Sequence, residues 1–301
     1  MIATYQALYL RHLQPLFMQH EFLEAEQKAL EINLDNSLYG TFAEIGAGQE
    51  VARYFFQAGA AAGTIAKTMS AYDKTYSDEI YGTEPSGRYV CESRLYKMLD
   101  HEFSLLVARL GKTRLNTNFF AFADTVSATN YAKTIPGDGW LGVRFQKSPD
   151  SPPNDLVIHV KMLDNDNRLQ QQAVGILGVN LLYACFFLSD DMDVMLQSLN
   201  DGLHNRVMID MIRLNGPSFK DVDNRALSFK LVKLGLSDVA MFDANGTNIH
   251  PSEFLYKKNV LLVRGAFRPI TYASYDIIRS SHEQFLEDEG LKDDEVKLMT
   301  E

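Results

Sequence analysis

Three segments of β-favouring composition follow one another between residues 118 and 163 with no helical pattern between them. They read NFFAFADTVSA, GWLGVRFQ and DLVIHVKML, and the turn sequences PGDG and SPDSPPND separate them. β-Branched and aromatic side chains favour strands, and short turns join antiparallel neighbours. The sequence therefore predicts an antiparallel portion of sheet in the middle of the chain.

Strand and helix patterns alternate on both sides of this portion. Residues 41–46 predict a strand, GAG a bend and residues 49–62 a helix, and a second strand and a helix follow at 63–73 and 91–110. After the β-rich portion the pattern predicts a buried helix, two further helices and three strands, at 169–188, 191–203, 223–235, 206–214, 238–242 and 260–265. The expected fold is α/β, with a mixed sheet that carries helices on its faces.

The linker-like sequence around 149–154 divides the chain into two regions. Residues 1–148 hold a helical start over 4–31 and the two β/α units, and residues 149–301 hold a second α/β region. The two regions are either separate domains or parts of one. The same reasoning leaves open that the chain is a C-terminally truncated piece of a longer protein.

Charge and cysteine content exclude several classes of partner. Lys and Arg total 29 against 39 Asp and Glu, a formal net charge of −10, which disfavours nucleic acid and anionic membranes as partners. Cys91 and Cys185 form no metal-binding or disulfide pattern, and the histidines form no HExxH or HxH motif. The sequence thus predicts a cytoplasmic protein with no metal site. The apolar run 173–188 is 16 residues long, short for a membrane span.

A glycine turn after the first predicted strand is the best candidate for a ligand site. Glu44, Gly46 and Gly48 lie between that strand and the following helix, where backbone N–H groups can receive a ligand. The segment resembles the first motif of class I methyltransferases, and the resemblance implies S-adenosylmethionine as cofactor, with Asp73 on its ribose hydroxyls. Lys67 adds a polar group, so a pocket is expected near Glu44, Lys67 and Asp73. The alternative is a tight turn with no ligand.

A second motif involves a strand and the loop that follows it. His159, Lys161 and Asp166 match the HxKxxxxD pattern of the phospholipase D superfamily, and the resemblance implies a His nucleophile and a phosphate-binding Lys. His159 and Lys161 share one face of a strand, so they could converge on one anion. No second copy of the motif exists in the chain, so such a site would need a homodimer. The alternative is an amphipathic strand that ends in a turn.

A third motif, FDANGT, begins at Phe242 and resembles the nucleophile motif of haloacid dehalogenase-like phosphatases. Asn245 replaces the second acid that this chemistry needs, and Asn-Gly is a strong signal for a hairpin. The segment 243–246 therefore predicts a hairpin turn between two antiparallel strands.

Most of the chain, including the segments YGTFAEIGAGQEVARYFFQAGAAAGTIAKTMSAYD, GILGVNLLYACFF and LLVRGAFRPIT, resembles an uncharacterised bacterial protein family. Members of that family carry the labels nicotinate-nucleotide adenylyltransferase and TonB-dependent receptor. The first activity needs an HxGH-type motif and the second needs a long series of barrel strands, and this sequence supplies neither.

These observations favour a binder or enzyme for a small nucleotide-like or anionic ligand at the glycine turn, with the cofactor unknown. Two alternatives stay open: a noncatalytic component that works through protein contacts, and a phospholipase D-like phosphodiesterase.

Overall fold

The computed structural model describes residues 21–301, which divide into two compact units. The first unit comprises Met1–Ala240 and Ala244–Asn248, and the second comprises Met241–Asp243 and Ile249–Glu301. The helical start expected over residues 4–31 lies partly outside the described residues. Its remaining part forms helix α2 (Ala25–Leu34).

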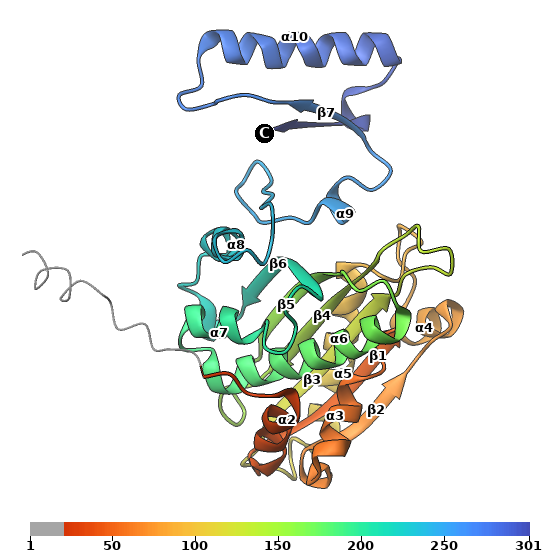
Figure 1. Cartoon of the computed structure of the whole chain (residues 1–301), viewed down its shortest axis with the longest axis vertical. Coiled ribbons are helices and arrows are strands. Elements are labelled where there is room, and N and C mark those ends of the chain that lie inside the picture. The colour runs from red at the N-terminus through yellow and green to blue at the C-terminus, as the bar shows by residue number, and fades with distance from the viewer. Residues whose placement is uncertain (1–20) are drawn as a thin grey trace, which may run out of the picture. The chain divides into compact units, whose positions relative to one another are not determined.

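The first unit contains a six-stranded mixed sheet in the order β2-β1-β3-β4-β5-β6 (Figure 1). Its strands are β1 (Leu38–Gly46), β2 (Ile65–Ser70), β3 (Asn118–Ser127), β4 (Gly137–Phe145), β5 (Asn154–Met162) and β6 (Val207–Asn215). Strand β1 pairs in parallel with β2 and β3, and the remaining pairs are antiparallel. The expected mixed sheet and its antiparallel middle are therefore confirmed.

Helices cover both faces of this sheet, because successive side chains of a strand point to opposite faces. Phe42 and Phe122 pack in one core with the helices α2, α3 and α6, whereas Ala43 and Ala123 pack in another core with α5. The helices of this unit after α2 are α3 (Val51–Ala58), α4 (Lys74–Tyr81), α5 (Glu92–Leu110), α6 (Asn167–Tyr183), α7 (Met192–Ser198) and α8 (Asn224–Lys233). Both faces of the central strands are therefore apolar and buried.

Helix α6 continues through a π-helical turn, Ala184–Leu188, and forms the buried helix that the apolar run predicts. The segment Asn167–Leu188 is long and apolar enough to cross a membrane, and 67% of its most apolar window is buried inside the protein. A Cβ atom at Gly178 would lie 2.3 Å from Val51 of α3, so glycine allows the two helices to approach closely. The segment is thus the core helix of this unit.

A fully buried lysine joins three helices behind the sheet. Lys28 of α2 is 0% exposed, and its Nζ donates to Asn180 Oδ1 at 2.9 Å, to Ser198 Oγ at 2.8 Å and to Asp201 Oδ2 at 2.7 Å. Burial lowers the Lys28 pKa, and the hydrogen bond and charge of Asp201 oppose that effect. The ammonium group is thus surrounded by acceptors, as a buried charge requires.

Residues 146–153 connect β4 and β5, which are neighbours in one sheet. The regions 1–148 and 149–301 therefore share this sheet, an arrangement that the sequence left open. The boundary between the compact units lies much later in the chain, near residues 240–249.

The second unit is a small βαβ element. Its elements are α9 (Pro251–Phe254), β7 (Asn259–Val263), α10 (Tyr272–Glu289) and β8 (Val296–Thr300), and β7 pairs with β8 in parallel. Residues 244 and 245 form the expected turn, with Gly246 at a φ of 80°. The expected antiparallel strands beside it are wrong, because the flanking residues form only single bridge positions, at Phe242 and Asn248, and β7 pairs with β8 in parallel.

Candidate functional site

The polar cavity nearest to the glycine turn lies at the carboxyl ends of β1 and β3. The connection after β1 runs through α3 to β2 on one side, and the connection after β3 runs to β4 on the other side. Strand ends from which the chain leaves in opposite directions form a crevice that commonly binds ligands in α/β proteins. The cavity there has a volume of about 400 Å³.

The lining of this cavity is polar but uncharged among the residues that the structure describes. It consists of Gly46, Ala47, Gln49, Tyr72, Tyr89, Val126, Ser127, Ala128, Thr129, Asn167 and Gln171. Two tyrosine rings offer stacking surfaces, and the amides and hydroxyls offer both donors and acceptors. This composition suits a planar, uncharged polar ring system.

Glu44 precedes Gly46, which lines this cavity, by two residues on β1, and it caps helix α3. Its Oε1 atom accepts a hydrogen bond from the backbone N–H of Val51 at 2.8 Å. The side chain is 5% exposed, and burial raises the Glu44 pKa to about 7, against the opposing effect of the hydrogen bond from Val51. The N–H groups expected to attract an anion at this helix start are therefore already bonded to a carboxyl group of the protein.

Asp124 is the neighbour of Glu44 across the pair of strands, and the sequence interpretation missed it. The two residues are Cα partners in the β1–β3 register, and Asp124 Oδ1 accepts a hydrogen bond from Ile45 N at 3.2 Å. Burial, together with the charge of Glu44, raises the Asp124 pKa well above its usual range. The signal available in the sequence was a lone acid inside the apolar run NFFAFADTV.

The two glycines are needed for packing inside the protein. A Cβ atom at Gly46, whose φ is 76°, would lie 2.2 Å from the carbonyl oxygen of Val126. A Cβ atom at Gly48 would lie 2.0 Å from Asp124 Oδ1. The space that Gly48 leaves is thus filled by a buried carboxyl group, so a larger side chain at this position would disturb the packing of the protein.

Replacing Gly48 with alanine is expected to lower the free energy of unfolding by about 2 kcal/mol, the usual cost of overpacking a core. The added methyl group must displace the Asp124 carboxyl, which is 0% exposed. Urea denaturation measures the effect. Gly63→Ala is the control, because a Cβ atom there meets nothing within 4 Å. Equal stability of the two variants would contradict the packing role of Gly48.

Lys67 and Asp73 do not join Glu44 around one cavity, so that expectation is wrong for the described residues. Lys67 lines a separate cavity of about 180 Å³, and its Nζ lies 2.5 Å from Glu102 Oε2. Asp73 caps helix α4, where its Oδ2 accepts from Tyr76 N at 2.8 Å. Gly46 alone of the expected cofactor-binding residues lines the larger cavity.

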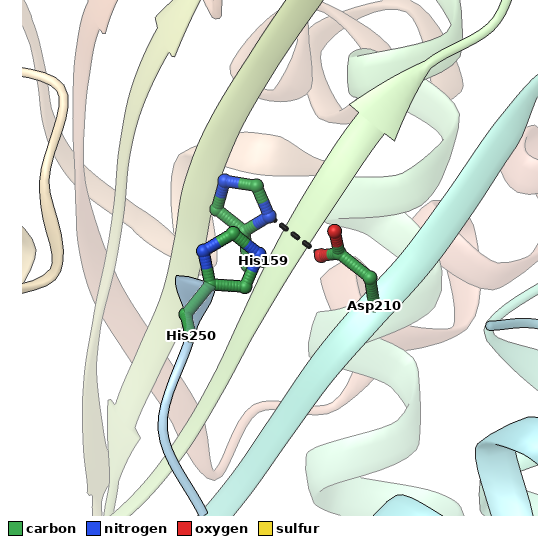
Figure 2. Close-up of side chains that lie close together, drawn as sticks. All are labelled: His159, Asp210 and His250. Carbon is green, nitrogen blue, oxygen red and sulfur yellow. Dashed lines mark hydrogen bonds and ion pairs between the residues drawn. The ribbon is translucent and has the colours of Figure 1, made fainter. Parts of the chain in front are cut away.

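His159 and Lys161 do share one face of β5, as the strand pattern predicts, but they converge on a carboxylate. Figure 2 shows the hydrogen bond between His159 Nδ1 and Asp210 Oδ1, which measures 2.6 Å. Lys161 Nζ lies 3.2 Å from Asp210 Oδ2, and Asp138 Oδ2 lies 3.5 Å from His159 Nε2. Asp138 and Asp210 therefore balance the charges of His159 and Lys161, which disfavours the binding of a phosphate by these two side chains.

Asp210 reaches His159 because β6 carries a bulge. The register runs from His159↔Met211 directly to Val160↔Ile209, so Asp210 is the extra residue. A bulge can redirect a side chain in this way, and no sequence pattern predicted this bulge. Asp166 is separate from this cluster: it caps α6, where its Oδ1 accepts from Arg168 N and Leu169 N.

Comparisons with known proteins give distant likenesses. A scan against family models finds no match, and a search of curated proteins finds none. Similar solved structures include competence/damage inducible protein CihA from Agrobacterium tumefaciens, with 17% identity, a TM-score of 0.38, and coverage of 53% of this chain and 94% of that chain. A competence or damage-inducible protein from Enterobacter asburiae matches with 15% identity, a TM-score of 0.37, and coverage of 54% and 95% respectively.

A competence-damaged protein (CinA) superfamily protein from Enterobacter cloacae matches with 15% identity, a TM-score of 0.36, and coverage of 57% of this chain and 98% of that chain. The resemblance drawn from the sequence did not name this superfamily. Likenesses at these TM-scores support no conclusion on the activity of this chain.

Proposed function

We propose that the protein binds a small nucleoside-like molecule, uncharged or cationic, in the cavity at the carboxyl ends of β1 and β3. The observation that carries the proposal is the lining: two tyrosines with amides and hydroxyls, and no charged side chain among the described residues. Nucleobases stack on aromatic rings and bond to amides and hydroxyls along their edges. A volume of about 400 Å³ falls in the usual range for a small-molecule site.

Charge decides between a nucleoside and a phosphorylated ligand. The helix starts beside the cavity belong to α3 and α6, and carboxyl groups of Glu44 and Asp166 accept hydrogen bonds from their first N–H groups. Asp124 adds a third acid close by. These carboxyl groups already accept the hydrogen bonds of the N–H groups that would otherwise bind a phosphate, so the anionic ligand considered from the sequence is the weaker candidate. S-Adenosylmethionine, which is cationic at sulfur, stays within the proposed class.

The test is a thermal-unfolding series with adenosine, S-adenosylmethionine and ATP, each at millimolar concentration. Adenosine or S-adenosylmethionine is expected to raise the Tm, because a ligand that binds only the folded state stabilises it. ATP is expected to raise it less, owing to its phosphates. No rise with any probe would overturn the proposal and leave the alternative of a component that works through protein contacts.

Tyr72→Ala locates the response in the cavity. Tyr72 is 76% exposed and lines the cavity, so its loss removes a stacking surface with little effect on the fold. The ligand-induced rise in Tm is expected to fall by at least half. Tyr76→Ala is the matched control, since Tyr76 is 63% exposed and lies outside the lining. An equal response of both variants would place the site elsewhere.

A further inference from the structure

A row of polar side chains leads from the cavity across the neighbouring strands. Ser127 lines the cavity at the end of β3, and its partner in the β4 register is Asp138. Asp138 in turn pairs with Lys161 of β5. Side chains of directly opposed residues point to the same face of a sheet with their Cβ atoms about 5 Å apart. Asp138 therefore stands one strand away from a residue that lines the cavity.

The Asp138 carboxylate has one oxygen engaged and one available. Its Oδ2 faces His159 Nε2 at 3.5 Å, and among the described residues its Oδ1 accepts no hydrogen bond. The side chain is 33% exposed, so solvent or a ligand reaches it. An ionised carboxylate only accepts hydrogen bonds, and it can accept two at once from adjacent hydroxyl groups.

His159 is the buried partner of this carboxylate. The imidazole is 1% exposed and packs edge-on against Trp140, with ring centroids 4.8 Å apart. Burial alone lowers the His159 pKa, but the hydrogen bonds and charges of Asp138 and Asp210 outweigh burial and raise it. His159 lies between the two acids, so it fixes the direction of the Asp138 side chain.

We propose that Asp138 binds the vicinal hydroxyls of the ribose when a nucleoside occupies the cavity, with His159 as its positioning residue. The inference rests on the proposed function, and it narrows the ligand to a ribonucleoside with free 2′ and 3′ hydroxyls. Carboxylates take this role in dinucleotide-binding α/β sheets because a hydroxyl pair offers two donors to two acceptor oxygens. The resemblance to methyltransferases implied that Asp73 binds the ribose hydroxyls. Asp73 caps α4 and does not line the cavity, so we assign this role to Asp138 instead.

The test is calorimetric titration of the wild-type protein and an Asp138→Asn variant with adenosine and 2′,3′-dideoxyadenosine. Asparagine keeps the shape and removes the charge, so adenosine affinity is expected to fall tenfold to a hundredfold. Dideoxyadenosine is expected to bind both proteins equally weakly. Asp164→Asn is the control: it removes an acid beside the end of β5, where Asp164 pairs with Arg206, and it should leave adenosine affinity unchanged.

The outcomes separate the two proposals. A wild-type protein that binds neither nucleoside overturns the proposed function and this inference together. Adenosine binding that Asp138→Asn leaves intact, or dideoxyadenosine binding as tight as that of adenosine, overturns this inference alone. Equal losses in Asp138→Asn and Asp164→Asn would show a general effect of charge, which also overturns it. The Tm of each variant without nucleoside verifies its fold.

Discussion

Replacing Lys28 with methionine is expected to lower the free energy of unfolding by about 3–5 kcal/mol, the usual cost of removing one partner from a buried ion pair. Methionine fills the same volume but donates nothing. Asp201, which is 7% exposed, would then lose the ammonium group beside it, and Asn180 and Ser198 would lose their donor. Most of the loss in the free energy of unfolding arises because these buried acceptors no longer receive the hydrogen bonds of Lys28.

Urea denaturation at neutral pH measures this change, and two further variants make it specific. Lys147→Met breaks an ion pair whose acid, Asp190, is 96% exposed, and it should cost less than about 1 kcal/mol. Adding Asp201→Asn to Lys28→Met removes the carboxylate that has lost its lysine, and it should restore part of the stability. A Lys28→Met protein as stable as Lys147→Met would show that the buried network contributes nothing.

The sequence predicted those parts of the fold that depend on local pattern. The strand at 41–46, the glycine bend and the helix at 49–62 are confirmed as β1 and the shorter α3, because β-favouring residues, two glycines and a helical apolar stripe follow one another there. The buried helix over 169–188 is also confirmed, because its apolar composition requires a buried environment. Neither prediction needed knowledge of distant contacts.

The candidate site was harder to predict because it depends on register between strands. Glu44 meets Asp124 only because β1 and β3 pair in parallel with these two residues opposite each other. Lys67 was expected beside Glu44, but it pairs with Thr41, while Ser70 pairs with Glu44. Three residues along a strand span about 10 Å, which is enough to move Lys67 into another cavity.

The phosphodiesterase motif illustrates the same limit. The spacing of His159 and Lys161 correctly placed both side chains on one face of β5, but it gave no information about what faces them. Asp210 reaches them through a bulge in β6, about 50 residues later in the chain. The motif thus predicted the local geometry of His159 and Lys161 correctly. The acids that determine the charge around these two residues lie on other strands, β4 and β6.

The pH dependence of stability is expected to report the buried pair Glu44 and Asp124. Burial raises the pKa of Glu44 to about 7 in the folded protein, from an ordinary value of 4.5. A carboxyl group whose pKa is raised by folding stabilises the protein fully below the ordinary pKa, and this contribution is lost as the pH rises through the folded value. The shift corresponds to about 3 kcal/mol of stability lost between pH 5 and pH 8. Asp124 shifts in the same direction and adds to the loss.

Glu44→Gln is therefore expected to be more stable than the wild type at pH 8 and close to it at pH 5. Glutamine cannot ionise, yet its Oε1 atom can still accept the hydrogen bond from Val51 that caps α3. Urea denaturation at both pH values measures the difference, and Glu50→Gln, at the same helix start but with its side chain 25% exposed, should keep nearly the wild-type dependence. If the wild type were equally stable at pH 5 and pH 8, Glu44 would have to ionise at its ordinary pKa. The site would then carry a full negative charge at neutral pH and favour a cationic ligand over an uncharged one.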